Sequence, residues 1–151
     1  QMSLVAFIAI AIYSYHVGSY TALSLSAIFI AILLGYLYYG KYPAKILPGD
    51  SLTYFLGAGF AATIIVGKIQ LFGLILIIPW LIEFLLKARA KFHANSWGLL
   101  QPDGTLKSPH EKIYSLTHVF MRVGHFKEWQ IVLFLTLLEV VFSLIALLSL
   151  W

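Results

Sequence analysis

The stretch TALSLSAIFIAILLGYLYY, residues 21–39, decides the fold of this chain. It contains no charged residue over its whole length. Because about 20 consecutive apolar residues are needed to cross the hydrocarbon core of a bilayer, the stretch predicts a membrane-spanning helix. Tyr36, Tyr38 and Tyr39 lie at its end. Tyrosine favours the membrane interface, so these three residues mark where the helix leaves the lipid.

The composition of the whole chain agrees with a membrane protein. Of 151 residues, 61% are hydrophobic and only 11% are charged. The mean hydropathy of +0.91 is typical of a chain surrounded by lipid. The absence of cysteine excludes a disulfide framework and thiolate metal ligands. We predict an all-α fold, a polytopic membrane helical bundle that residues 1–151 form as a single transmembrane domain. About five transmembrane helices fit, at residues 2–16, 21–39, 51–66, 71–86 and 129–151.

Three residues inside the predicted spans need comment. Pro79 lies within the fourth span and predicts a kink there, because proline removes a helix hydrogen bond. Glu83 lies one turn before Lys87, which predicts an i,i+4 ion pair. Glu139 has no local partner in the fifth span, where an ionised group is costly. The role of Glu139 stays open.

The basic residues predict the orientation of the chain. Seven of the ten Lys and Arg residues lie between Lys87 and Lys127. Because cytoplasmic loops are rich in these residues, we expect this loop in the cytoplasm. Counting spans back from it places Lys68 outside and returns the link from Lys41 to Asp50 to the cytoplasm. The net charge of +4 follows from this bias and from attraction to anionic lipid, so no nucleic-acid partner is expected.

The large polar loop, residues 87–128, contains two local patterns. GLLQPDGTLKSP, residues 98–109, has apolar residues on both sides of Asp103-Gly104, which predicts a small β-hairpin. HEKIYSLTHVFMRVGHF, residues 110–126, has apolar residues at helical spacing with bases and histidines between them. This second pattern predicts an amphipathic helix on the membrane surface.

Asp50 allows two interpretations. It follows Gly49 at the start of the third predicted span, and Asp before an apolar run is an ordinary N-cap. The pattern by itself favours that structural role. The functional interpretation is a ligand for a divalent cation such as Mg²⁺, which takes one or two carboxylates and completes its shell with water and substrate phosphates.

The basic segment KARAKFH, residues 87–93, also allows two interpretations. Bases directly after a span anchor it on the cytoplasmic side, and this would explain Lys87 and Arg89. The same side chains could bind phosphate groups through charge-assisted hydrogen bonds. The two roles are compatible, so the segment does not decide between them.

A resemblance to a known family favours the functional interpretations. YPAKILPGDSLTYFLGAGFA, residues 42–61, resembles a segment of the polyprenyl-phosphate N-acetylhexosamine-1-phosphate transferases, in which Tyr-Pro, Gly-Asp and a Gly-rich helix recur. The likeness is closest to the eukaryotic and archaeal branch, which uses UDP-N-acetylglucosamine and dolichyl phosphate and begins N-glycosylation. Residues 1–7, QMSLVAF, resemble the helix after the family's Asn-Gly-Leu-Glu motif, and residues 103–109 resemble its cytoplasmic hairpin.

The resemblance implies a role for particular residues. Asp50, which follows Gly49 in the Gly-Asp pair, would be the catalytic residue that binds Mg²⁺, with Mn²⁺ as an alternative, and Gly49 would lie at the substrate. Arg89, Lys91 and His93 would bind the nucleotide sugar. Here the sequence departs from the family, because RAKFHAN at residues 89–95 lacks the His-Arg-x-Pro-Arg form.

The resemblance also implies an activity. A glycosyltransferase of this family moves N-acetylglucosamine 1-phosphate from UDP-N-acetylglucosamine (UDP-GlcNAc) to a polyprenyl or dolichyl phosphate and releases UMP, in glycan or cell-envelope assembly. Family members have about ten spans and an aspartate-rich motif, whereas this chain has no adjacent pair of acids. The chain then corresponds to the C-terminal half, inactive alone, with the N-terminal half of the same enzyme as its partner. A homodimer is left open.

The expected location is an integral membrane one, in the plasma membrane of an archaeon or the endoplasmic reticulum of a eukaryote, with the active face cytoplasmic. The alternative is a non-catalytic small helical membrane protein or a transporter fragment. The sequence leaves open the exact sugar donor, the lipid chain length and the oligomeric state. It also leaves open whether the chain is a natural product or a fragment.

Overall fold

The computed structural model describes residues 1–93 and 95–148. Within these ranges it contains seven helices and one two-stranded sheet, in the order α1, α2, α3, α4, α5, β1, β2, α6 and α7. Two compact units are present. We call Gln1–Leu76 with Glu139–Trp151 the helical unit and Ile77–Leu138 the loop unit. Each unit is described by itself.

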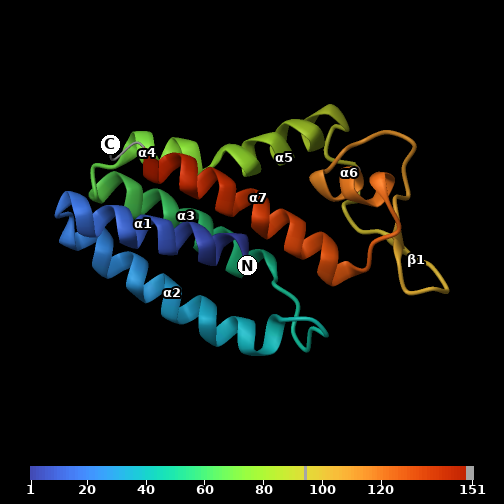
Figure 1. Ribbon diagram of the computed structural model, residues 1–151, viewed down its shortest axis with the longest axis horizontal. Helices are drawn as coiled ribbons and strands as arrows, with labels where there is room; N and C mark the ends of the chain where they lie inside the picture. Colours follow the sequence, from blue (N-terminus) through green and yellow to red (C-terminus); the bar gives the residue numbers. More distant parts are fainter. Residues whose placement is uncertain (94, 149–151) are drawn as a thin grey trace. The chain divides into compact units, whose positions relative to one another are not determined.

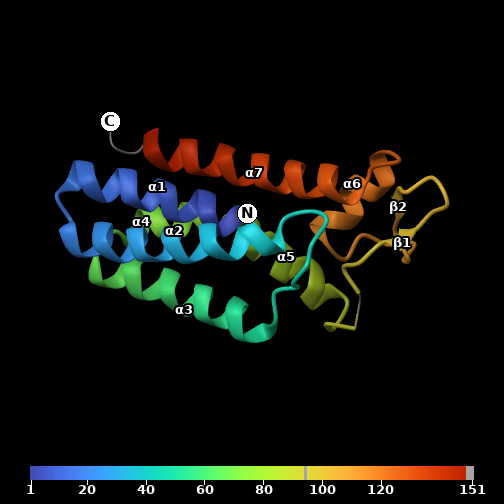
Figure 2. The same cartoon turned by 90° about the horizontal axis from the view of Figure 1, so that it is seen from below.

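The helical unit is built from antiparallel neighbours. α1 (Met2–Val17) and α2 (Tyr20–Gly40) run side by side, and α3 (Asp50–Val66) lies beside α2, as Figures 1 and 2 show. Gly18 ends α1 in a left-handed conformation with φ of 75°, which glycine adopts without steric cost. α4 (Gln70–Leu76) follows α3 after a short turn.

One hydrogen bond places two turns at the same end of this unit. The hydroxyl of Ser19, between α1 and α2, donates to the carbonyl oxygen of Gly67, which follows α3, at 3.2 Å. Counting back one further span from the link at Lys41 to Asp50 predicts that the turn at residues 16–20 lies on the same side as Lys68, and this contact agrees with that prediction.

Polar side chains inside the helices bind their own backbone. The hydroxyl of Ser26 donates to the carbonyl of Ala22, and that of Thr63 donates to the carbonyl of Gly59 at 2.7 Å. Such bonds to the residue four positions earlier satisfy a hydroxyl where no water is present. Glu139 differs, because it is fully buried and its carboxylate has no hydrogen-bond partner within the described residues.

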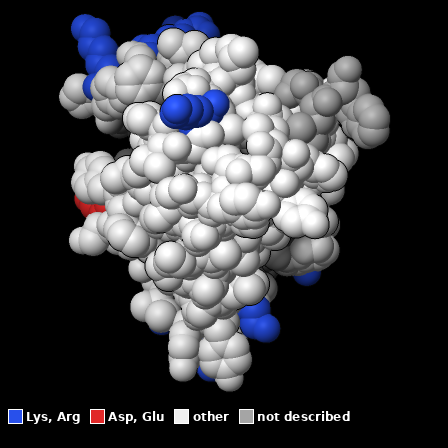
Figure 3. All heavy atoms as spheres, turned by 90° about the vertical axis from the view of Figure 1, so that its left-hand side faces the viewer, with Lys and Arg blue, Asp and Glu red and all other residues white. Residues whose placement is uncertain are grey.

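The all-helical membrane fold predicted from sequence is confirmed. In the described part of the chain, α2 and α7 (Glu128–Leu148) each have the length and composition of a membrane span. The pair of α4 and α5 (Ile78–Arg89) would add a third if the two helices form one broken span, and α1 and α3 are shorter apolar helices. Residues 149–151 of the fifth predicted span lie outside the described residues. Figure 3 shows a face on which charged side chains are sparse among the described residues drawn there.

The kink predicted at Pro79 is a break in the helix. α4 ends at Leu76 and α5 begins at Ile78, so Pro79 lies in the first turn of the new helix. Proline is tolerated in the first turn because the N–H that it lacks would have no partner there. The fourth predicted span is therefore two helices rather than one.

The predicted hairpin is confirmed in the loop unit. β1 (Leu99–Leu100) pairs with β2 (Leu106–Lys107) in antiparallel register, and Gly104 has φ of 80° in the turn. The carboxylate of Asp103 accepts hydrogen bonds from the hydroxyl and the backbone N–H of Thr105, at 2.7 and 3.0 Å. These two bonds to Thr105 stabilise the ionised form and lower the pKa of Asp103.

The predicted amphipathic helix over residues 110–126 is shorter in the structure. α6 spans only Leu116–Val123. Ser115 caps its start by accepting the N–H of Thr117, and Gly124 follows its end. The residues before it are irregular because the hydroxyl of Ser108 binds both the N–H and the carbonyl of His110, which competes with helix formation.

We predict that Gly59 cannot accept a methyl group. A Cβ atom there would lie 1.9 Å from the ring of Phe29, which stacks on Phe7 with the ring centroids 4.6 Å apart. Gly59→Ala should destabilise the protein by about 1–3 kcal/mol because the packed rings must move. The measurement is thermal unfolding of the full-length protein in detergent.

Gly57 provides the matched control on the same helix. A Cβ atom at Gly57 meets nothing within 4 Å, so Gly57→Ala should cost much less than Gly59→Ala, since alanine favours the helix. Equal melting temperatures for the two variants would contradict the close contact between α2 and α3.

Candidate functional site

Asp50 is the first residue of α3, and Gly49 is the N-cap. The cap interpretation of Asp50 is therefore wrong, because its side chain does not close the helix start. The carboxylate is exposed, and within residues 1–93 and 95–148 it enters no hydrogen bond or ion pair. It is free to bind a cation beside the helix N-terminus.

The link that leads to Asp50 is fully exposed but tied to α2. Residues 41–49 all face solvent. The backbone N–H of Lys45 donates to the carbonyl of Tyr39 at 2.9 Å. A weak bond of 3.5 Å joins the hydroxyl of Tyr36 to the carbonyl of Ile46. The link is thus held near the end of α2 although it contains no helix or strand.

The basic side chains follow the end of α5 in the loop unit. The N–H of Lys91 donates to Ala88, and that of Phe92 donates to Lys87. This is the Schellman arrangement, in which the residue at the position of Lys91 is usually glycine. Lys91 instead adopts a left-handed backbone with φ of 51°. Such strain costs of order 1 kcal/mol and is frequent at functional sites.

Arg89, Lys91 and His93 are all exposed. In the described part of the chain, none of their side chains forms a hydrogen bond or ion pair. Three exposed basic or imidazole groups therefore lie at the end of α5 and in the residues directly after it, where each can bind an anion. Gly49 and Asp50 belong to the helical unit, and each group is described within its own unit.

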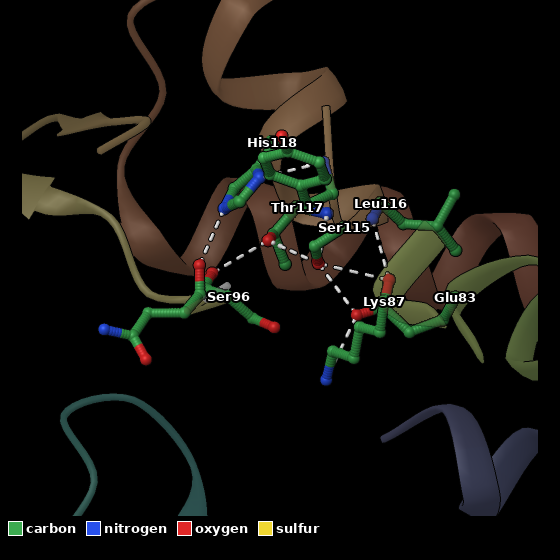
Figure 4. Close-up of polar contacts among 9 residues, drawn as sticks. Glu83, Lys87, Ser96, Ser115, Leu116, Thr117 and His118 are labelled. Carbon is green, nitrogen blue, oxygen red and sulfur yellow. Dashed lines mark hydrogen bonds and ion pairs between the residues drawn. The ribbon is translucent and has the colours of Figure 1, made fainter. Parts of the chain in front are cut away.

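A polar network that the sequence did not reveal joins α5 to α6 (Figure 4). The carboxylate of Glu83 accepts the hydroxyl of Ser115 at 2.8 Å and the backbone N–H of Leu116 at 2.7 Å. It also pairs with Lys87 at 3.3 Å, which confirms the predicted ion pair. A carboxylate at a helix start is favourable because the unpaired N–H groups there carry positive partial charge.

The first turn of α6 also binds the segment that follows His93. The hydroxyl of Thr117 donates to the carbonyl of Ser96 at 2.8 Å. Nε2 of His118 lies 3.0 Å from the carbonyl of Asn95, and Nδ1 accepts the N–H of Tyr114 at 3.3 Å. These partners fix the neutral tautomer with the proton on Nε2. His118 is completely buried, and this burial lowers its pKa, which agrees with a neutral ring.

Sequence reasoning missed this network because its members are distant along the chain. Glu83 and Ser115 are 32 residues apart, and Asn95 and His118 are 23 apart. Only the local pair of Glu83 and Lys87 is visible as a pattern. The Ser residue before an apolar helical run is a weak signal for the start of α6.

The residues present fit a magnesium ion only in part. Within the described residues, no group of three or more His, Cys, Asp and Glu side chains could hold a metal. Asp50 offers one free carboxylate. Magnesium accepts one or two carboxylates and takes its other ligands from water and phosphate, so Asp50 fits such a site but does not complete it.

The chain is similar to known proteins over most of its length. Residues 1–68 match the family described as glycosyl transferase family 4. A relative from Saccharolobus solfataricus is 44% identical over 82% of the chain, and one from Sulfolobus acidocaldarius is 38% identical over 85%. Both carry the provisional name UDP-N-acetylglucosamine–dolichyl-phosphate N-acetylglucosaminephosphotransferase. A third, from Methanocaldococcus jannaschii, is 39% identical over 57% of the chain and is provisionally named a glycosyltransferase.

In the relatives from Saccharolobus solfataricus and Sulfolobus acidocaldarius, the matched region is the C-terminal part of the protein. The chain spans 38% and 39% of the length of these relatives. The resemblance stated from the Gly-Asp segment is confirmed.

Proposed function

We propose that this chain is the C-terminal half of a membrane enzyme that transfers N-acetylglucosamine 1-phosphate. The donor is UDP-GlcNAc and the acceptor is a polyprenyl or dolichyl phosphate. The support is the 44% and 38% identity to two proteins whose provisional names state this reaction. The N-terminal half of the enzyme supplies the remaining groups, so the chain alone is inactive.

The reaction is an exchange of one phosphorus–oxygen bond for another. An oxygen of the lipid phosphate attacks the β-phosphorus of UDP-GlcNAc. The bond from the β-phosphorus to the bridging oxygen breaks, and UMP leaves. The lipid diphosphate sugar remains in the membrane. Catalysis of phosphoryl transfer depends mostly on positioning and on neutralising charge, which is what exposed acids and bases at helix ends can supply.

Asp50 is the residue to which we assign the metal. When bound, Mg²⁺ neutralises charge on the diphosphate. Asp50 would be the residue of this chain that holds the ion, through its free carboxylate. Gly49 leaves the approach to it open, because a glycine carries no side chain. Asp50 and its neighbour Ser51 also present backbone N–H groups at the start of α3, which favours a phosphate nearby.

The bases after α5 bind the donor in this proposal. The guanidinium of Arg89 and the ammonium of Lys91 form charge-assisted hydrogen bonds with phosphate oxygens. His93 donates to a phosphate or sugar oxygen. Their exposure and their lack of partners within the described residues support this assignment. We place the site on the cytoplasmic face, where the positive-inside bias puts the loop.

We predict that Asp50→Asn in the full-length enzyme lowers Mg²⁺-dependent UMP release at least about 100-fold, because the amide cannot replace a charged metal ligand. The melting temperature should change little, since within the described residues the Asp50 side chain forms no hydrogen bond or ion pair. The assay is the initial rate of UMP release from UDP-GlcNAc with polyprenyl phosphate.

Glu111→Gln is the control, because Glu111 is an exposed acid of the loop unit. It should retain the wild-type rate. Normal turnover by Asp50→Asn would overturn the metal assignment, and absence of UMP release by the wild-type enzyme would overturn the proposed reaction.

We also predict opposite effects on stability and binding at Lys91. Lys91→Gly should raise the free energy of unfolding by up to about 1 kcal/mol, because glycine adopts the left-handed conformation without strain. It should also raise the KM for UDP-GlcNAc several-fold, because a phosphate contact is lost.

Lys68 is the matched control for this experiment. It has the same left-handed geometry, with φ of 56°, in the turn after α3 and outside the proposed site. Lys68→Gly should stabilise the enzyme similarly and leave the KM for UDP-GlcNAc unchanged. A wild-type KM in Lys91→Gly would show that the strained lysine serves only as an anchor.

A further inference from the structure

The basic residues Arg89, Lys91 and His93 lie in a stretch of chain that hydrogen bonds hold both before and after His93. At its start, the Schellman bonds of Lys91 and Phe92 hold it to the end of α5. Further along, Asn95 and Ser96 are bound by the first turn of α6. His93 directly follows Phe92 and precedes Asn95 by two residues, so chain connectivity tethers it on both sides to residues that α5 and α6 hold.

The second attachment lies next to a cavity. This cavity of about 290 Å³ is lined by Ser96, Trp97 and Gly98 and by Thr117 and Met121 of α6. Trp97 is 73% exposed. Because packing around Ser96 and Trp97 is incomplete, the bonds to Asn95 and Ser96 constrain the backbone directly.

α6 can hold the segment because α6 is itself bound to α5. Glu83 of α5 binds the hydroxyl of Ser115 and the N–H of Leu116, so the start of α6 is docked on the helix that carries Arg89. His118 lies in this docked turn and is fully buried. A buried ring with both nitrogens engaged has little freedom to move.

We propose that His118 is a positioning residue for donor binding, because its Nε2–H holds the carbonyl of Asn95 and thereby sets the backbone that presents His93 and Lys91. This inference rests on the proposed function. His118 does not touch substrate. It acts through the segment, and its loss should weaken binding of UDP-GlcNAc while leaving the lipid acceptor unaffected.

Two substitutions of His118 distinguish its hydrogen bond with Tyr114 from its hydrogen bond with Asn95. In His118→Asn the amide oxygen lies near the position of Nδ1 and accepts the N–H of Tyr114, but the side chain is too short to reach Asn95. In His118→Gln the amide nitrogen reaches the position of Nε2 and donates to Asn95. Both side chains are neutral and polar.

The experiment is steady-state UMP release by the full-length enzyme, with UDP-GlcNAc and polyprenyl phosphate varied in turn. His118→Asn should raise the donor KM about tenfold, the effect of one lost hydrogen bond. The acceptor KM should not change, and His118→Gln should restore the donor KM to within about twofold of wild type. An unchanged donor KM in His118→Asn, or an equal rise in both KM values, overturns the proposal.

A second measurement tests the proposal without an activity assay, and a second variant is available if His118→Asn does not fold. Hydrogen exchange of the backbone amides from Phe92 to Trp97 should be faster in His118→Asn than in His118→Gln. If His118→Asn does not fold, Thr117→Val removes the bond to Ser96 and should produce the same changes. Wild-type enzyme that releases no UMP overturns the proposed function alone, whereas unchanged exchange in these variants overturns the positioning role.

Discussion

The constraint on which this structure depends is that lipid offers no hydrogen-bond partners. Every backbone group inside a span must be satisfied within its own helix. The hydroxyls of Ser26 and Thr63 follow the same rule by binding carbonyls one turn earlier. Polar chemistry is therefore favoured at the helix ends, where backbone groups are unpaired and water is available, and Glu139 inside α7 is an exception. Asp50 at the start of α3 and the bases after α5 occupy such ends.

Local signals in the sequence predicted the features that depend on neighbouring residues. The hairpin at Asp103-Gly104, the interruption at Pro79 and the pair of Glu83 with Lys87 all follow from short-range rules, and the structure contains each of them. The predicted spans are apolar helices in the structure, but of the described helices only α2 and α7 have by themselves the length and composition of a span. The predicted helix over residues 110–126 is too long. The hydroxyl of Ser108 binds the backbone of His110, and this local bond competes with helix formation although the apolar residues have helical spacing.

The features that sequence reasoning missed depend on contacts between distant segments. Nothing near Asn95 indicates that His118 binds its carbonyl, and nothing near Glu83 indicates that it docks α6. The left-handed backbone of Lys91 could not be predicted from sequence either, because residues other than glycine rarely adopt positive φ. Under the proposed function, these long-range contacts constrain the chain next to the basic residues before the donor binds.

The central claim is that the Asp50 carboxylate binds the metal that neutralises the donor diphosphate. Affinity cleavage tests it most directly. Fe²⁺ replaces Mg²⁺ in the full-length enzyme in the presence of UDP-GlcNAc. Ascorbate and peroxide then generate radicals at the bound Fe²⁺. Mass spectrometry identifies the peptide bonds that these radicals cleave. The account predicts cuts beside Asp50 that are lost in Asp50→Asn. Absence of cuts beside Asp50, or the same cuts in Asp50→Asn, would contradict it.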